Sequence, residues 1–168
     1  MGEDKKMYIK GIVDEDFVNY KKPSMFIACH SCSFKCDKLN GQQVCQNGAL
    51  ASVPSIDVSI NTLVNRYLEN DITNAVVFGG LEPFDDIENI TIFIQKLRHS
   101  DNNDDIVIYT GYTEEEIKNT FKDYYNIIKN YSNIIIKYGR YIMNQEKHFD
   151  AILGVDLSSN NQYSKKIS

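Results

Sequence analysis

Apolar residues along this chain follow two kinds of pattern. Four short runs are almost continuously apolar and predict strands: residues 24–30, 74–78, 106–109 and 133–137. The run at 74–78 is of the type that is buried on both faces of a sheet. Between the runs, apolar residues recur at helical spacing at 60–70 and 87–99, and again from residue 114 onward. Ser59, and Thr113 together with Glu116, are placed to cap two of these helices.

Strands that alternate with helices imply parallel βαβ units with right-handed crossovers. A stretch of alternating pattern at 7–13 predicts an additional edge strand. From Tyr138 onward the chain is rich in Asn, Ser and Lys and has no clean period, so we expect loop or extended structure there. A length of 168 residues can bury a full core, and no linker or repeat is evident. We therefore expect a single domain over residues 1–168.

Composition narrows the classes of function. A net charge of −5 and a hydrophobic content of 42% suggest neither disorder nor broad nucleic-acid binding. The first ten residues lack the apolar core of a signal peptide, and no run of about 18 apolar residues could span a membrane. We expect a cytoplasmic protein that binds neither nucleic acid nor a membrane.

All four cysteines lie within residues 25–47: Cys29, Cys32, Cys36 and Cys45. In a reducing compartment such a group is more typical of metal ligands or redox groups than of disulfides. The C-x2-C-x3-C-x8-C spacing could supply four thiolates to a structural zinc ion, so a zinc-stabilised binding module is one candidate. Cys29 falls inside the predicted strand at 24–30, where a buried and inert thiol is the expected role.

Two further loops follow predicted strands, as the cysteine loop does. They are Gly79-Gly80-Leu81-Glu82-Pro83 and Thr110-Gly111-Tyr112. Ligands of parallel α/β sheets bind at the carboxyl ends of the strands. Glycine lets the backbone approach a ligand closely, and a fixed carboxylate such as that of Glu82 could hold an amino group. The three loops together indicate a metal cofactor beside an amino-bearing ligand.

Taken in order, these motifs resemble the radical S-adenosylmethionine enzymes, and among them the activating enzymes of anaerobic ribonucleotide reductases. Cys32 and Cys36 match the start of the family's C-x3-C-x2-C motif, and Cys45 followed by Gln46 and Asn47 matches its end. The glycine loop matches the family's Gly-Gly-Glu/Asp-Pro motif with Leu81 inserted. The resemblance extends to residues 108–115, Tyr138-Gly139-Arg140, Ser158-Ser159-Asn160 and Gln162.

The cysteine spacing departs from the family pattern. Eight residues separate Cys36 from Cys45 where the family has two, and Leu39 stands where the third cysteine normally falls. We interpret residues 37–44 as an insertion, after which Cys45 supplies the third thiolate. Gly41 would help the longer loop to fold back, since three sulfurs must converge on one cluster.

The resemblance implies an incomplete TIM-type parallel β/α barrel that holds a 4Fe-4S cluster and S-adenosylmethionine, with the cofactor chelating an open iron. The implied site residues fall into three sets: Cys32, Cys36 and Cys45 as iron ligands; Gly79, Gly80 and Glu82 at the amino end of S-adenosylmethionine; and Thr110, Gly111 and Tyr112 along the side of its pocket.

The implied activity is that of an oxidoreductase that generates radicals. In the activases, a 5′-deoxyadenosyl radical takes hydrogen from a glycine on the large subunit of the anaerobic reductase. The implied partners are that subunit and a small electron-donor protein such as a flavodoxin. Two alternatives remain: a radical enzyme acting on a small molecule or another macromolecule, and the zinc-stabilised binding module.

Overall fold

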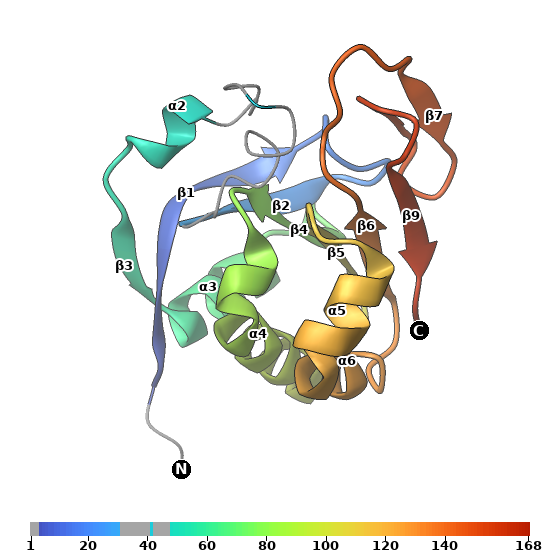
Figure 1. Cartoon of the computed structure of the whole chain (residues 1–168). Helices are drawn as coiled ribbons and strands as arrows, with labels where there is room; N and C mark the ends of the chain where they lie inside the picture. Colours follow the sequence, from blue (N-terminus) through green and yellow to red (C-terminus); the bar gives the residue numbers. More distant parts are fainter. Residues whose placement is uncertain (1–3, 31–40, 42–47) are drawn as a thin grey trace.

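A computed structural model describes residues 4–30, 41 and 48–168 of the chain. These residues form one seven-stranded sheet and one two-stranded sheet (Figure 1). The strands of the large sheet are, in spatial order, β3 (Ile56–Ser59), β1 (Lys6–Asp16), β2 (Ser24–Cys29), β4 (Ala75–Gly80), β5 (Asp105–Tyr109), β6 (Ile134–Tyr138) and β9 (Tyr163–Lys166). The small sheet pairs β7 (His148–Asp150) with β8 (Val155–Leu157).

The described helices are α2 (Gly48–Ala51), α3 (Ile60–Leu68), the 3-10 helix η1 (Pro83–Asp86), α4 (Ile87–His99), α5 (Glu114–Thr120) and α6 (Lys122–Ile128). Two of them, α3 and α5, begin at the caps that the sequence predicts. The Ser59 hydroxyl accepts a hydrogen bond from the Thr62 amide at the start of α3, and Thr113 with Glu116 forms a capping box on α5. Both predicted caps are confirmed. In the part of the chain that the structure describes, no helix is long and apolar enough to cross a membrane.

Four strands at the centre of the sheet, β2, β4, β5 and β6, run parallel to one another. Each connection between them contains a helix: α3 precedes β4, α4 precedes β5, and α5 with α6 precedes β6. Parallel neighbours need such crossovers, because a tight turn reverses the direction of the chain. These are the parallel units that the alternation of patterns predicted.

The predicted incomplete TIM-type parallel barrel is wrong, because the seven-stranded sheet contains antiparallel strands and is open. β1 pairs antiparallel with both β2 and β3, and β9 pairs antiparallel with β6. The connection at 17–23 holds no helix and is too short for a crossover, so β1 and β2 can be neighbours only as an antiparallel pair. Among the described strands, the edge strands β3 and β9 do not pair with each other, so the sheet does not close.

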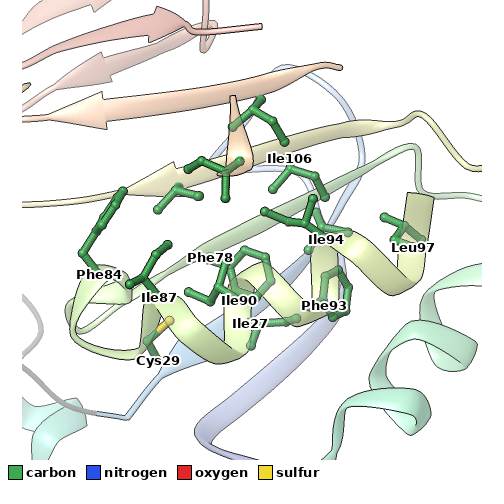
Figure 2. Packing of buried hydrophobic residues seen from close by; sticks show 14 of the residues in the cluster. Ile27, Cys29, Phe78, Phe84, Ile87, Ile90, Phe93, Ile94, Leu97 and Ile106 are labelled. Carbon is green, nitrogen blue, oxygen red and sulfur yellow. The ribbon is translucent and has the colours of Figure 1, made fainter. Parts of the chain in front are cut away.

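Helices α3, α4, α5 and α6 cover one face of the sheet and bury the larger core (Figure 1). In β4, Val76 and Phe78 belong to this core, whereas Ala75 and Val77 belong to a smaller core on the opposite face. Figure 2 shows Phe78 close to Phe93 of α4, and their ring centroids lie 5.3 Å apart in an edge-to-face arrangement. β4 is therefore buried on both faces, as its continuous apolar run predicted.

The C-terminal segment covers the opposite face of the sheet. Leu153 and Leu157, from the β7–β8 hairpin, pack there with Tyr20 from the connection between β1 and β2. The Lys21 amide donates to the Leu153 carbonyl at 2.8 Å, which ties this connection to the hairpin. The extended structure expected after Tyr138 is thus present, and it forms part of a second layer.

Candidate cofactor site

A cavity of about 400 Å³ lies at the carboxyl ends of β4, β5 and β6. Five of the six residues predicted to contact the cofactor line it: Gly79, Gly80, Glu82, Thr110 and Gly111. The opposite wall comes from β8 and from Ser158 and Gln162, which precede β9. Loops that are far apart in the sequence therefore surround one cavity, at the strand ends where the sequence analysis expected them. The role of these residues as cofactor ligands stays a prediction.

Glu82 joins the loops that follow β4 and β5. Its side chain is buried, with 7% of the residue exposed. One carboxylate oxygen accepts hydrogen bonds from the Thr110 hydroxyl at 2.7 Å and the Phe84 amide at 3.0 Å, and the other accepts from the Gly111 amide at 2.8 Å. Burial raises the pKa of Glu82 to about 7, although these hydrogen bonds favour the ionised form. Glu82 therefore fixes the two loops of the cavity wall relative to each other and also provides a carboxyl group in that wall.

Packing requires glycine at the last two residues of β4, Gly79 and Gly80. A Cβ atom on Gly79 would lie 2.9 Å from a ring carbon of Phe26. Gly80 has a φ of +77°, and a Cβ atom there would lie 2.9 Å from Cδ2 of Leu50 and 3.2 Å from the Cα of Ala28. Only glycine combines this conformation with the available space. The close approach that the sequence assigned to a ligand is made here by neighbouring protein atoms.

Tyr112 is the predicted cofactor residue that the structure places in the helix-side core. Its ring packs edge-to-face on Phe121 with centroids 5.2 Å apart, and its hydroxyl donates to Asp85 at 2.8 Å. The Arg140 guanidinium lies 5.9 Å from the ring centroid and forms an ion pair with Glu116 at 2.7 Å. Tyr112 therefore packs in the helix-side core and anchors the end of the Thr110-Gly111 loop there, and it is not part of the cavity lining.

Lys137 is a cavity residue that the sequence analysis did not single out. It lies in β6, is 8% exposed, and is the cation among the described residues that line the cavity. Its ammonium donates to the Gly139 carbonyl at 3.0 Å and approaches the Thr110 carbonyl at 3.5 Å. The sequence feature that could have identified Lys137 is its position at the end of the apolar run NIIIK. Its direction into the cavity, however, depends on the pleat and pairing of β6.

Cys29 is the cysteine that the structure describes, and it lies at the end of β2 opposite Gly80 of β4. Only 1% of the residue is exposed, and Figure 2 shows its sulfur directed into the helix-side core beside Ile87. Burial raises the pKa of the Cys29 thiol well above its ordinary value. Its predicted burial is confirmed. Cys32, Cys36 and Cys45, the predicted iron ligands, lie outside the described residues.

The structure is that of a mixed-sheet protein with helices on one face and a cavity at the carboxyl ends of its parallel strands, the position where ligands of parallel sheets bind. A family model described as "4Fe-4S single cluster domain" matches residues 23–163, so the chain belongs to this family and is an iron-sulfur protein. No curated protein and no solved structure matches the chain. The matched segment contains all four cysteines and every described residue that forms the cavity wall after β2.

Proposed function

We propose that this iron-sulfur protein is an S-adenosylmethionine-dependent activase that installs a glycyl radical on the large subunit of an anaerobic ribonucleotide reductase. The observation that carries the proposal is the cavity edged by Gly79, Gly80 and Glu82 at the end of β4. β4 pairs with β2, and β2 leads into the cysteine motif. A small electron-donor protein such as a flavodoxin would reduce the cluster.

The described residues suit S-adenosylmethionine by size and charge. A cavity of about 400 Å³ falls within the range of about 300–1,000 Å³ that small-molecule sites occupy. The cofactor carries an ammonium and a carboxylate at one end, and the cavity offers the carboxylate of Glu82 and the ammonium of Lys137. Phe26 and Tyr109 line the cavity with aromatic rings that suit a nucleoside.

The cysteine residues divide into two roles under this proposal. Cys32, Cys36 and Cys45 would ligate the cluster as thiolates, the usual ligands of such clusters. When bound, the cluster and S-adenosylmethionine supply the electron transfer and the radical. Cys29 would keep its place in the helix-side core, as its burial indicates.

Two of this chain's own contacts prepare the cavity for the cofactor. The hydrogen bonds of Glu82 with Thr110 and Gly111 fix the loops after β4 and β5 relative to each other. A carboxylate held in this way needs little reorganisation when an ammonium group binds beside it. Buried side chains around the cavity would also limit the access of water to a reactive radical.

The zinc-stabilised module has less support than the cluster protein. It needs four thiolates around one tetrahedral ion, and Cys29 would have to leave the helix-side core to provide the fourth. The family match is to a 4Fe-4S domain. The alternative of a small-molecule substrate has no separate observation in its favour.

Anaerobic reconstitution with iron and sulfide, followed by electron paramagnetic resonance of the dithionite-reduced protein, tests the proposal. We expect a 4Fe-4S signal that changes when S-adenosylmethionine is added, and a glycyl radical on added reductase subunit. Cys45→Ala should abolish cluster assembly, whereas Cys29→Ala should spare it. A cluster that never responds to S-adenosylmethionine would refute the activase proposal, and a full cluster in Cys45→Ala would refute the assignment of the third ligand.

A further inference from the structure

The Gly139 carbonyl, which directly follows β6, is an acceptor shared by two side chains of the cavity. It accepts from the Lys137 ammonium at 3.0 Å and from the side-chain amide of Gln162 at 3.2 Å. The Gly139 amide in turn donates to the Tyr112 carbonyl at 3.0 Å. The two peptide groups that flank Gly139 are therefore fixed by hydrogen bonds to three different parts of the chain.

Gln162 uses both ends of its side chain in this arrangement. Its amide oxygen accepts from the backbone amides of Ser158 at 3.1 Å and Ser159 at 3.2 Å, while its nitrogen donates to Gly139. The residue is buried, with 6% exposed, and it lines the cavity. Gln162 thus connects the loop before β9 to the end of β6.

The backbone at Gly139 has little freedom to adopt another conformation. Its φ is +104°, and a Cβ atom there would lie 3.2 Å from the side-chain nitrogen of Asn161 and 3.3 Å from the Cα of Gln162. Glycine adopts this φ readily and has no Cβ atom, so the backbone of Gly139 can lie close to the loop before β9. The position of the Gly139 carbonyl is therefore set by the loop that Gln162 holds.

The geometry points to Gln162 as a positioning residue that acts through Lys137 on the carboxylate end of the bound cofactor. This inference rests on the proposed function, which makes S-adenosylmethionine the ligand. A lysine ammonium on four methylene groups is mobile unless an acceptor fixes it, and ordering such a side chain costs conformational entropy. By holding the Gly139 carbonyl, Gln162 keeps the ammonium oriented at the cavity before the ligand arrives.

The experiment compares two ligands that differ only at the end in question. S-Adenosylhomocysteine carries the amino-acid group, whereas 5′-methylthioadenosine lacks it. Binding of each to the cluster-loaded protein is measured by isothermal titration calorimetry. In Gln162→Leu we expect roughly a tenfold rise in Kd for S-adenosylhomocysteine, the factor expected from disturbing one hydrogen bond to a charged group. The Kd for 5′-methylthioadenosine should change less than about twofold.

Two further variants separate positioning from folding. Gln162→Met keeps a side chain of similar length but cannot donate to Gly139 and adds no charge, so it should show the same selective loss, and it decides the matter if Gln162→Leu does not fold. Tyr163→Phe, the matched control, removes a hydrogen bond from Tyr163 to Glu114 outside the cavity and should change neither Kd. In a Lys137→Met background, Gln162→Leu should add no further loss.

The outcomes distinguish the two proposals. Equal weakening of both ligands in the Gln162 variants, or no weakening of either, would overturn the positioning role while leaving the proposed function intact. Failure of the unmutated protein to bind S-adenosylhomocysteine would instead overturn the proposed function, and the inference about Gln162 with it.

Discussion

Burial of the Glu82 carboxylate predicts that the protein loses stability as the pH rises toward neutrality. The pKa of Glu82 rises from 4.5 to about 7 on folding, because desolvation outweighs the hydrogen bonds that Thr110, Gly111 and Phe84 donate to the carboxylate. The nearby charge of Asp85 acts in the same direction as desolvation. The folded protein therefore binds this proton more tightly than the unfolded chain does.

The direction and size of the effect follow from that difference. The stabilisation is fully present below pH 4.5, where both states hold the proton, and it is lost as the pH rises through 7. One pKa unit corresponds to about 1.4 kcal/mol, so a shift from 4.5 to about 7 changes the free energy of unfolding by about 3 kcal/mol. Glu82→Gln removes the titration and should remove this dependence.

Equilibrium urea unfolding of the cluster-free protein at pH 5, 6, 7 and 8, followed by far-ultraviolet circular dichroism, measures the effect. The free energy of unfolding of the unmutated protein, minus that of Glu82→Gln, should fall by about 2.5 kcal/mol across this range, because part of the effect is already lost at pH 5. Taking the difference cancels groups common to both proteins, including the three histidines. Glu115→Gln, at an exposed position on α5, is the matched control and should show no such change. Parallel pH curves for the unmutated protein and Glu82→Gln would refute the reasoning.

Three further predictions concern single positions. Gly80→Ala should cost about 1–3 kcal/mol in urea unfolding, because φ is +77° and Leu50 blocks the new Cβ, whereas Gly11→Ala, which meets nothing within 4 Å, should cost less than about 0.5 kcal/mol; equal costs would contradict the packing argument. Thr113→Ala should cost about 1 kcal/mol by removing the capping box of α5; an unchanged urea midpoint would contradict it. Cys29→Ala should lower thermal stability and keep the full iron content, and loss of iron in that variant would make Cys29 a ligand.

Local patterns predicted the elements that depend on neighbouring residues. The run that became β4 was identified as buried on both faces because its residues are apolar on both sides of the pleat, and Val76 and Val77 do face opposite cores. The caps at Ser59 and Thr113 were found because a cap is a contact between residues three apart. These interactions are complete within a few residues, so the sequence is sufficient to define them.

The architecture of the whole sheet was predicted wrongly because strand direction at the edges is not a local property. The resemblance suggested a parallel barrel, but the β1–β2 connection contains no helix and the chain after β6 forms a hairpin before β9. Both connections place an antiparallel strand at the side of the parallel strands. The pattern at 7–13 predicted a strand correctly, but the predicted edge position is wrong, because β3 pairs with the outer side of β1. The pattern also carried no information on the direction of β1.

The sequence by itself determined which residue types stand at the ends of the strands: two glycines at the end of β4 and a carboxylate shortly after it, and Thr110 and Gly111 after β5. Only the tertiary structure decided what those groups contact. Glu82 meets Thr110 across 28 positions of sequence, and Gln162 meets Gly139 across 23. Such contacts depend on strand order and register, which are set by the packing of the entire sheet, and so no local pattern records them.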